Sequence, residues 1–203
     1  MKTANIAVLV SGGGTNLQAL IDAQNSGVLS SGEIVLVVSS TAGAYALERA
    51  KNAGIDSVVC SRKELGSQEA FESAICEQLD KYGIQLIVLA GFMSILSADF
   101  TRRYPERIIN VHPALIPSFC GKGFYGLRVH EAALSYGVKV TGATVHFVNE
   151  IPDGGRIIAQ KAVEVLPGDT PEVLQRRVME QAEWILLPQA AEDVSKAILE
   201  QGE

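Results

Sequence analysis

Five short apolar runs, rich in β-branched residues, recur along the first half of the chain. They lack the polar alternation of half-exposed strands and are typical of strands buried on both faces of a parallel sheet. Between them lie segments with helical spacing, at 16–27, 44–54 and 67–83, each ending on a glycine able to cap a helix. This pattern predicts an α/β fold with a doubly wound, mostly parallel sheet. The predicted strands are residues 5–10, 33–39, 56–60, 85–91 and 107–111.

The pattern changes after residue 112. Turn residues Pro152 to Gly155 separate two extended runs, which predicts a hairpin and therefore antiparallel C-terminal strands. Thr170 and Pro171 suit the N-cap and the first position of a long C-terminal helical region. The expected order is a Pro/Gly-rich stretch at 113–126, a short helix at 128–136, strands at 140–148 and 156–165, and the helical region at 168–202.

Size and charge limit the function classes. A chain of 203 residues with 47% hydrophobic residues fits one domain, 1–203. The net charge is −6, without a basic stripe, so nucleic acid is not an expected partner.

Cysteine usage and the N-terminus predict a cytoplasmic protein. Cys60, Cys76 and Cys120 are odd in number and form no CxxC pair, which favours free thiols over disulfides or a structural zinc site. The apolar run of residues 6–10 is a strand rather than a signal peptide, and no segment approaches the roughly 18 apolar residues of a membrane span.

The glycine-rich segment SGGGTNLQAL, residues 11–20, follows the first predicted strand and opens a helix. Consecutive glycines allow close approach to a ligand, and free N–H groups at a helix start favour an anion. A phosphate site and a simple tight turn are both open readings of this loop. Thr15 and Gln18 have the spacing of a capping box.

Two common phosphate motifs do not match this loop. No Lys follows its glycines, so it is not a P-loop, and Leu17 stands where the dinucleotide fingerprint has its third glycine. The second strand also ends without the acid that would hold an adenosine ribose. A small phosphorylated metabolite is therefore favoured over NAD.

Asn110 and His112 lie two residues apart where the fifth predicted strand ends before Pro113. The carboxyl ends of parallel strands line the ligand crevice, and residues two apart on a strand face the same side. Both side chains are therefore candidates to address one substrate atom. A structural hydrogen-bonding role for His112 remains the alternative.

The other histidines are weaker candidates. His130 is expected on a surface helix, and His146, within an apolar strand, in the core or near the site. Their spacing does not suggest a metal site.

Asp153 is the remaining candidate. An Asp before two glycines suits a turn, but if this turn folds over the same sheet edge, the Asp153 carboxylate would raise the pKa of His112.

Five motifs, in order and over nearly the whole chain, resemble the phosphoribosylglycinamide formyltransferase family: AVLVSGGGTNLQAL, LIVLAGFMSIL, IINVHPALIPSF, VTGATVHFV and DGGRII. The resemblance implies formyl transfer from 10-formyltetrahydrofolate, a co-substrate, to the amine of glycinamide ribonucleotide, with no metal. It implies that Asn110 and protonated His112 stabilise the oxyanion and that Asp153 tunes His112 and orders a proton-relaying water.

The resemblance also implies the binding residues. For the ribonucleotide these are Gly14, Thr15, Asn16, Pro113 and Glu183, with Gly12 and Gly13 shaping the loop; for Glu183 a solvated helix charge is the alternative. For the folate they are Met93, Ser94, Ile95, Leu96, Asn149, Glu150, Ile151 and Pro152. The N-terminal half would then hold the ribonucleotide, and the C-terminal half the folate and the catalytic groups, in a monomer or homodimer.

Two departures and several rival functions remain. Gln68 stands near a position where members of the family often carry Arg, and the loop 118–129 is longer than in many members. The rivals are a formyltetrahydrofolate hydrolase, a methionyl-tRNA or sugar-nucleotide formyltransferase, and a non-catalytic module that binds a phosphorylated metabolite.

Overall fold

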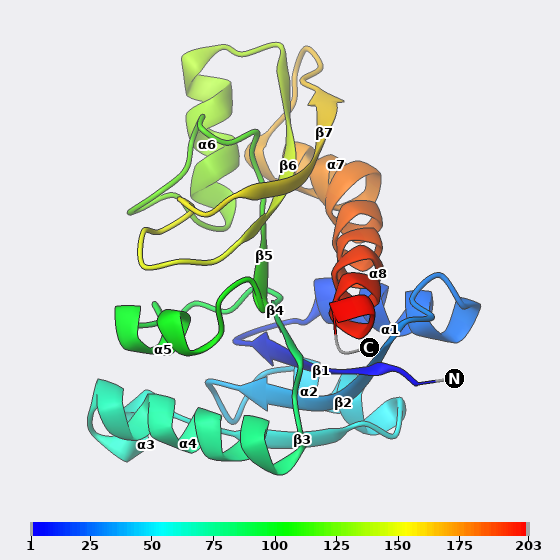
Figure 1. Cartoon of the computed structure of the whole chain (residues 1–203). Helices are drawn as coiled ribbons and strands as arrows, with labels where there is room; N and C mark the ends of the chain where they lie inside the picture. The colour runs from blue at the N-terminus through cyan, green and yellow to red at the C-terminus, as the bar shows by residue number, and fades with distance from the viewer. Residues whose placement is uncertain (1, 202–203) are drawn as a thin grey trace.

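A computed structural model describes residues 2–201 of the chain. One seven-stranded sheet runs through this part, in the order β3-β2-β1-β4-β5-β6-β7 (Figure 1). Strands β1 to β5 are parallel, and β6 and β7 are antiparallel to their neighbours, as predicted. The strands are β1 (Ala4–Val10), β2 (Gly32–Ser39), β3 (Asp56–Val59), β4 (Leu86–Leu89), β5 (Ile108–His112), β6 (Val140–Phe147) and β7 (Ile157–Glu164).

The helices alternate with the strands and then close the chain. Two of them, α3 and α5, are short and were not predicted, because four to six residues are too few to show a helical period. They are α1 (Thr15–Ser26), α2 (Ala46–Asn52), α3 (Arg62–Leu65), α4 (Gln68–Lys81), α5 (Ala98–Arg103), α6 (Leu127–Tyr136), α7 (Pro171–Val178), the π-helix η1 (Met179–Glu183) and α8 (Trp184–Gln201).

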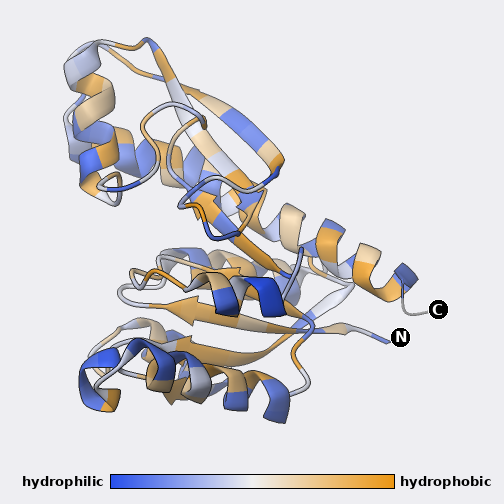
Figure 2. Cartoon of the chain, turned by 60° about the vertical axis from the view of Figure 1, so that its left-hand side comes forward, coloured by the Kyte–Doolittle hydropathy of each residue, from blue (hydrophilic) through white to orange (hydrophobic). Residues whose placement is uncertain are grey.

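The central strands of the sheet are buried on both faces. Ile6, Val8 and Val10 of β1 pack with residues of α1, α2, α7 and α8, whereas Ala7 and Leu9 face α4 and α5 on the other side. This period of two explains why the strand sequences are apolar without alternation. Figure 2 shows these central strands as mainly hydrophobic, between helices that mix hydrophobic and hydrophilic residues.

The chain order reverses between β1 and β4, which are neighbours in the sheet. At such a switch point the connections leave in opposite directions, and a crevice opens at the carboxyl ends of the strands. The glycine-rich loop follows β1 at this edge, and the loop with Met93 follows β4. Met93 N–H donates a hydrogen bond to Ser11 Oγ at 2.9 Å, so the two loops are in contact.

Local helix signals were only partly right. The expected capping box is wrong: helix α1 begins at Thr15, but its N-cap is Gly14, in the left-handed conformation and with no side-chain cap. Gly27 is the C-cap of α1, as predicted. The C-caps of α2 and α4 are instead Ala53 and Tyr82, and in each case the left-handed glycine follows one residue later.

The C-terminal helical region begins as expected. Thr170 Oγ1 accepts a hydrogen bond from Val173 N–H, and Pro171 occupies the first turn of α7. The predicted region extended to Gly202, which lies outside the described residues. None of the helices between residues 2 and 201 is both long and apolar enough to cross a bilayer.

Candidate active site

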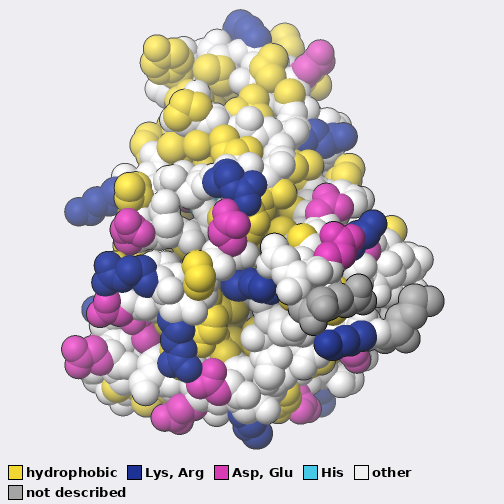
Figure 3. All heavy atoms as spheres, in the orientation of Figure 1, with side chains coloured by type: hydrophobic (Ala, Val, Ile, Leu, Met, Phe, Trp, Pro, Cys, Tyr) yellow, Lys and Arg dark blue, Asp and Glu magenta, His cyan; other side chains and the backbone are white. Residues whose placement is uncertain are grey.

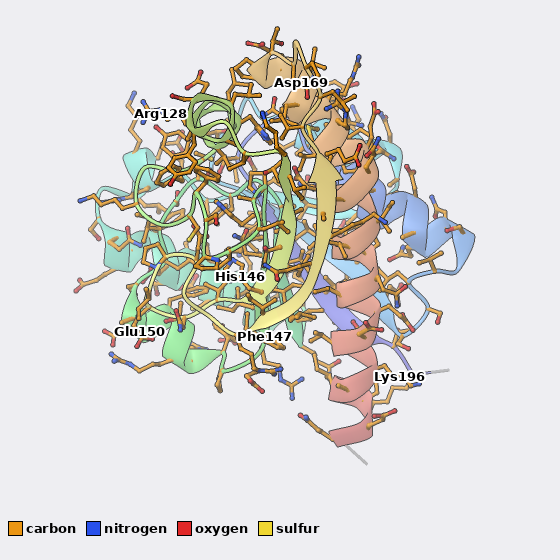
Figure 4. All side chains as sticks on the ribbon, turned by 90° about the horizontal axis from the view of Figure 1, so that it is seen from above. Arg128, His146, Phe147, Glu150, Asp169 and Lys196 are labelled. Carbon is orange, nitrogen blue, oxygen red and sulfur yellow. The ribbon has the colours of Figure 1, made fainter. Side chains whose placement is uncertain are left out.

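Two polar side chains meet across the antiparallel strands β5 and β6. Asn110 pairs with His146 across the two strands, and Asn110 Nδ2 donates a hydrogen bond to His146 Nε2 at 3.3 Å. The β6–β7 pairing shifts register between Val145 and His146, and such bulges often redirect a side chain beside an active site. Figure 4 shows His146 inside the molecule and Glu150 near its outer edge.

Asp153 lies between the two buried histidines. Its Oδ2 is 3.5 Å from His112 Nδ1, and its Oδ1 is 3.6 Å from His146 Nε2. Gly121 N–H donates to Asp153 Oδ2 at 2.8 Å. The turn after β6 therefore folds over the carboxyl end of β5, and the predicted grouping of Asn110, His112 and Asp153 is present in the fold.

The pKa values of this group reflect burial first. Burial lowers the pKa of His112, which is 4% exposed, and the His146 ring acts in the same direction. The Asp153 carboxylate raises the pKa of His112, as expected from the sequence, but does not outweigh burial. Additional negative charge near the ring would favour the imidazolium more strongly.

The pKa of Asp153 lies below its ordinary value. Burial acts to raise it, but the neighbouring His146, the hydrogen bond from Gly121 N–H and the nearby His112 together outweigh burial. Asp153 is thus held as a carboxylate next to an imidazole that burial keeps mainly neutral in the free protein. Such a pair suits proton transfer and the stabilisation of developing negative charge.

The prediction for His130 is wrong. Its side chain is 1% exposed rather than on a helix surface, and neither ring nitrogen has a hydrogen-bond partner within residues 2–201. Burial, with a smaller contribution from His112, lowers its pKa to about 4. Helix α6 therefore carries a neutral imidazole into the interior close to the catalytic group.

The glycines of the glycine-rich loop differ in their surroundings. Gly14 has a φ of 70°, and a Cβ there would lie 2.6 Å from the Cβ of Ala46. Gly12 and Gly13 face open space. Arg49, which the sequence did not single out, donates from Nε to the Gly13 carbonyl oxygen at 2.9 Å and brings a positive charge beside the loop.

Glu183 lies against this loop, although it is distant in the sequence. Asn16 Nδ2 donates to Glu183 Oε2 at 2.8 Å. Glu183 is 6% exposed, so the solvated-charge alternative is wrong, and burial raises its pKa. It ends the π-helix η1, a rare element that often occurs at functional sites.

A cavity of about 130 Å³ opens beside Asn110, His146 and Asp153. It contains both predicted folate segments except Met93, which is exposed at the same loop. Each predicted site therefore draws residues from both halves of the chain. The lining residues are Leu89, Phe92, Ser94, Ile95, Leu96, Asn110, His146, Val148, Asn149, Glu150, Ile151, Pro152 and Asp153.

Residues 4–190 match the family profile described as "Formyl transferase". The chain belongs to the formyl transferase family. The resemblance stated from the five motifs is confirmed by this match, which covers most of the chain and includes all the residues assigned above.

Relatives of this formyl transferase differ in how much of their own length the chain spans. The chain is 43% identical to "Phosphoribosylglycinamide formyltransferase" of Haemophilus influenzae over 87% of its own length and 80% of that protein. It is 46% identical to "Trifunctional purine biosynthetic protein adenosine-3" of Gallus gallus over 98% of its length, but spans only 19% of that relative.

Solved structures give the same fold. The formyl transferase superposes on glycinamide ribonucleotide transformylase 1 from Symbiobacterium toebii with a TM-score of 0.89 and 42% identity. The match covers 96% of this chain and 89% of that one. The predicted mixed sheet with antiparallel C-terminal strands is thereby confirmed.

The structure shows what surrounds the two features that differ from the family pattern, Gln68 and the longer loop 118–129. Gln68 Nε2 donates to Glu72 Oε1 and, at 3.1 Å, to the carbonyl oxygen of Ile95, so it touches the loop that lines the cavity. The segment 118–121 of the longer loop contacts His112 and Asp153.

No group of three or more His, Cys, Asp or Glu side chains among residues 2–201 is arranged to hold a metal ion. Basic and acidic side chains are interspersed on the face shown in Figure 3. The three cysteines, Cys60, Cys76 and Cys120, are free thiols.

Proposed function

We propose that the chain is a phosphoribosylglycinamide formyltransferase. It would transfer the formyl group of 10-formyltetrahydrofolate to the amine of glycinamide ribonucleotide, giving the formylated ribonucleotide and tetrahydrofolate. The observation that carries the proposal is the convergence of Asn110, His112 and Asp153 at one sheet edge, between a glycine-rich loop and an apolar cavity, in a formyl transferase family member.

The reaction proceeds by direct attack. The amine nitrogen of the ribonucleotide forms a bond to the formyl carbon, and the carbonyl electrons move to the oxygen. The amine then loses a proton, the folate nitrogen gains one, and the bond between that nitrogen and the formyl carbon breaks as the carbonyl re-forms. No bond to the enzyme is made.

The catalytic side chains supply what this sequence of steps needs. Asn110 and the imidazolium form of His112 donate hydrogen bonds to the oxyanion. Asp153 stabilises that imidazolium from 3.5 Å and holds the water that relays the proton. Burial lowers the pKa of His112 and favours the neutral ring. The negative charges of Asp153 and of the oxyanion act against burial and favour the protonated ring during the reaction.

The substrates occupy opposite sides of this group. Gly14, Thr15 and Asn16 bind the ribonucleotide phosphate, Glu183 binds the ribose hydroxyls, and Pro113 adjoins the substrate. The pterin enters the cavity between 93–96 and 149–152. Because about 130 Å³ is below the roughly 300–1,000 Å³ of usual ligand sites, the rest of the folate lies outside it, against exposed Met93, Ile95 and Ile151.

A spectrophotometric assay of folate product tests the proposal. Purified protein should release tetrahydrofolate only when glycinamide ribonucleotide is present. Equal release without the ribonucleotide would instead identify a formyltetrahydrofolate hydrolase. No release under either condition would refute the proposal and leave a formyltransferase with another acceptor or a non-catalytic binding module. We place the activity in the cytoplasm, in a monomer or homodimer.

A further inference from the structure

The loop after β5 contacts both catalytic side chains through its backbone. His112 Nε2 lies 2.8 Å from the carbonyl oxygen of Phe119. Two residues later, Gly121 N–H donates to Asp153 Oδ2, also at 2.8 Å. The segment Phe119–Gly121 is therefore in direct contact with the pair formed by His112 and Asp153.

The contact with Phe119 assigns the proton on the ring. A carbonyl oxygen carries no hydrogen, so a 2.8 Å hydrogen bond requires the proton to be on His112 Nε2. Nδ1, 3.5 Å from the Asp153 carboxylate, is then the nitrogen that gains or loses a proton. A backbone carbonyl is a common means of fixing a histidine tautomer.

The backbone at Phe119 is unusual. Its φ is 49°, and Phe119 and Asp153 are two of the three non-glycine residues with positive φ among residues 2–201. Such conformations are costly and cluster at functional sites. The ring of Phe119 packs against Phe124 and Tyr136, with centroids 6.4 Å and 6.0 Å apart, which helps to hold it there.

The start of the same loop is fixed to the sheet. Thr144 Oγ1 donates to the carbonyl oxygen of Ala114 at 2.7 Å and accepts from Ile116 N–H at 3.1 Å. Gln160 Nε2 donates to Thr144 Oγ1 and to the carbonyl oxygen of Ile116. These hydrogen bonds hold residues 114–116 against β6 and β7. The loop therefore starts from a fixed position and can place the carbonyl oxygen of Phe119 accurately.

We propose that Phe119 is a positioning residue whose backbone carbonyl holds His112 with Nε2 protonated, so that Nδ1 is the nitrogen that acts in the reaction. The side chain of Phe119 serves to keep the backbone in the left-handed conformation. The catalytic consequence rests on the proposed formyl transfer, whereas the tautomer does not.

Nitrogen NMR of the protein labelled with ¹⁵N-histidine tests the tautomer directly, with His112→Gln used to assign the resonances. Above the pKa of His112, the wild-type protein should show a proton on Nε2 and a lone pair on Nδ1. A neutral ring protonated on Nδ1 would overturn the proposal, and this result needs no variant at position 119 and no activity.

Two substitutions separate the backbone of Phe119 from its ring. Asparagine tolerates positive φ, whereas valine, being β-branched, does not. Phe119→Val should give a mixture of tautomers and lower kcat on the order of 100-fold, a loss typical of a misplaced catalytic group, with smaller changes in KM. Phe119→Asn should keep the Nε2–H tautomer and lower kcat by a few-fold.

Lys122→Ala, an exposed change in the same loop, is the matched control and should behave as wild type. Equal losses of kcat in Phe119→Asn and Phe119→Val, with the tautomer unchanged in both, would show that the ring matters and the carbonyl does not. If wild type has the predicted tautomer but no formyl transfer, the proposed function fails and the tautomer assignment stands.

Discussion

His112 Nδ1 and Asp153 Oδ2 lie 3.5 Å apart, one at the end of β5 and the other in the turn between β6 and β7. Burial lowers the pKa of His112, and the neighbouring His146 and a hydrogen bond from Gly121 help to keep Asp153 ionised. The free protein therefore favours a neutral His112 ring beside a carboxylate, and negative charge that develops near the ring would favour its protonation. In the proposed direct formyl transfer, the oxyanion would supply that charge.

Removing either member of the pair should affect turnover more than binding. His112→Ala and Asp153→Asn are expected to lower kcat by about 10²- to 10⁴-fold, because both groups act on charge that develops in the transition state. Asparagine also tolerates the positive φ of Asp153. Calorimetric titration should give a ribonucleotide Kd close to wild type, and wild-type turnover in either variant would refute the assigned roles.

Buried His130 should make stability depend on pH. Its pKa is about 4 in the folded protein and about 6.5 in an unfolded chain, so unfolding between these values takes up a proton. The free energy of unfolding should therefore fall as the pH drops from about 6.5 to about 4. Urea titrations should show that His130→Leu removes this contribution.

Ser135→Ala is the control for that experiment, since Ser135 is exposed on the same helix. Its stability should follow the wild-type pH dependence. A His130→Leu variant with the full wild-type slope would mean that other groups cause it.

Glu183 should matter for the ribonucleotide and little for the folate. Glu183→Gln replaces the buried carboxyl group with an amide of the same shape and keeps an acceptor for Asn16, so we expect a folded protein. Losing a charged hydrogen bond to the ribose should raise the KM for the ribonucleotide about tenfold. Steady-state kinetics with each substrate varied in turn measures this, with exposed Glu180→Gln as the control. A larger rise in the folate KM would contradict the assignment.

Gly14 and Gly13 should differ sharply in their tolerance of alanine. At Gly14 the φ is 70° and a Cβ would clash with Ala46, so Gly14→Ala should lower the free energy of unfolding by about 2 kcal/mol or more. At Gly13 a Cβ would meet open space, so the same change should have little effect on stability. Chemical denaturation of both variants compares them, and equal losses would show that the φ of Gly14 is not restrictive.

Local sequence patterns predicted the positions of the helices and strands better than the burial and the capping contacts of their residues. The strands were found because a buried parallel strand must be apolar on both faces, and β1 is. The period of α6 located the helix, but not the side on which His130 would be buried, because that depends on the loop and strands packed against it. The capping box failed because Gly14, held against Ala46, already starts α1.

The site was predicted in parts. The strand-end rule placed Asn110 and His112 at the crevice, the turn pattern proposed Asp153 as the partner of His112, and the motifs added Glu183 and the folate segments. Nothing in the sequence pointed to Arg49 beside Gly13 or to the carbonyl of Phe119 on His112, because a backbone group leaves no signature in the residue type.

The sequence by itself determined the α/β fold, the family and the residue types of the site, because burial, turns and motifs are local properties of a chain. Only the tertiary structure decided which groups meet. Asn16 and Glu183 form a 2.8 Å hydrogen bond, and His112 lies between Phe119 and Asp153, because the sheet order and the docking of α8 bring distant segments to one edge. The pKa values depend on those contacts and on burial, which are properties of the packed molecule.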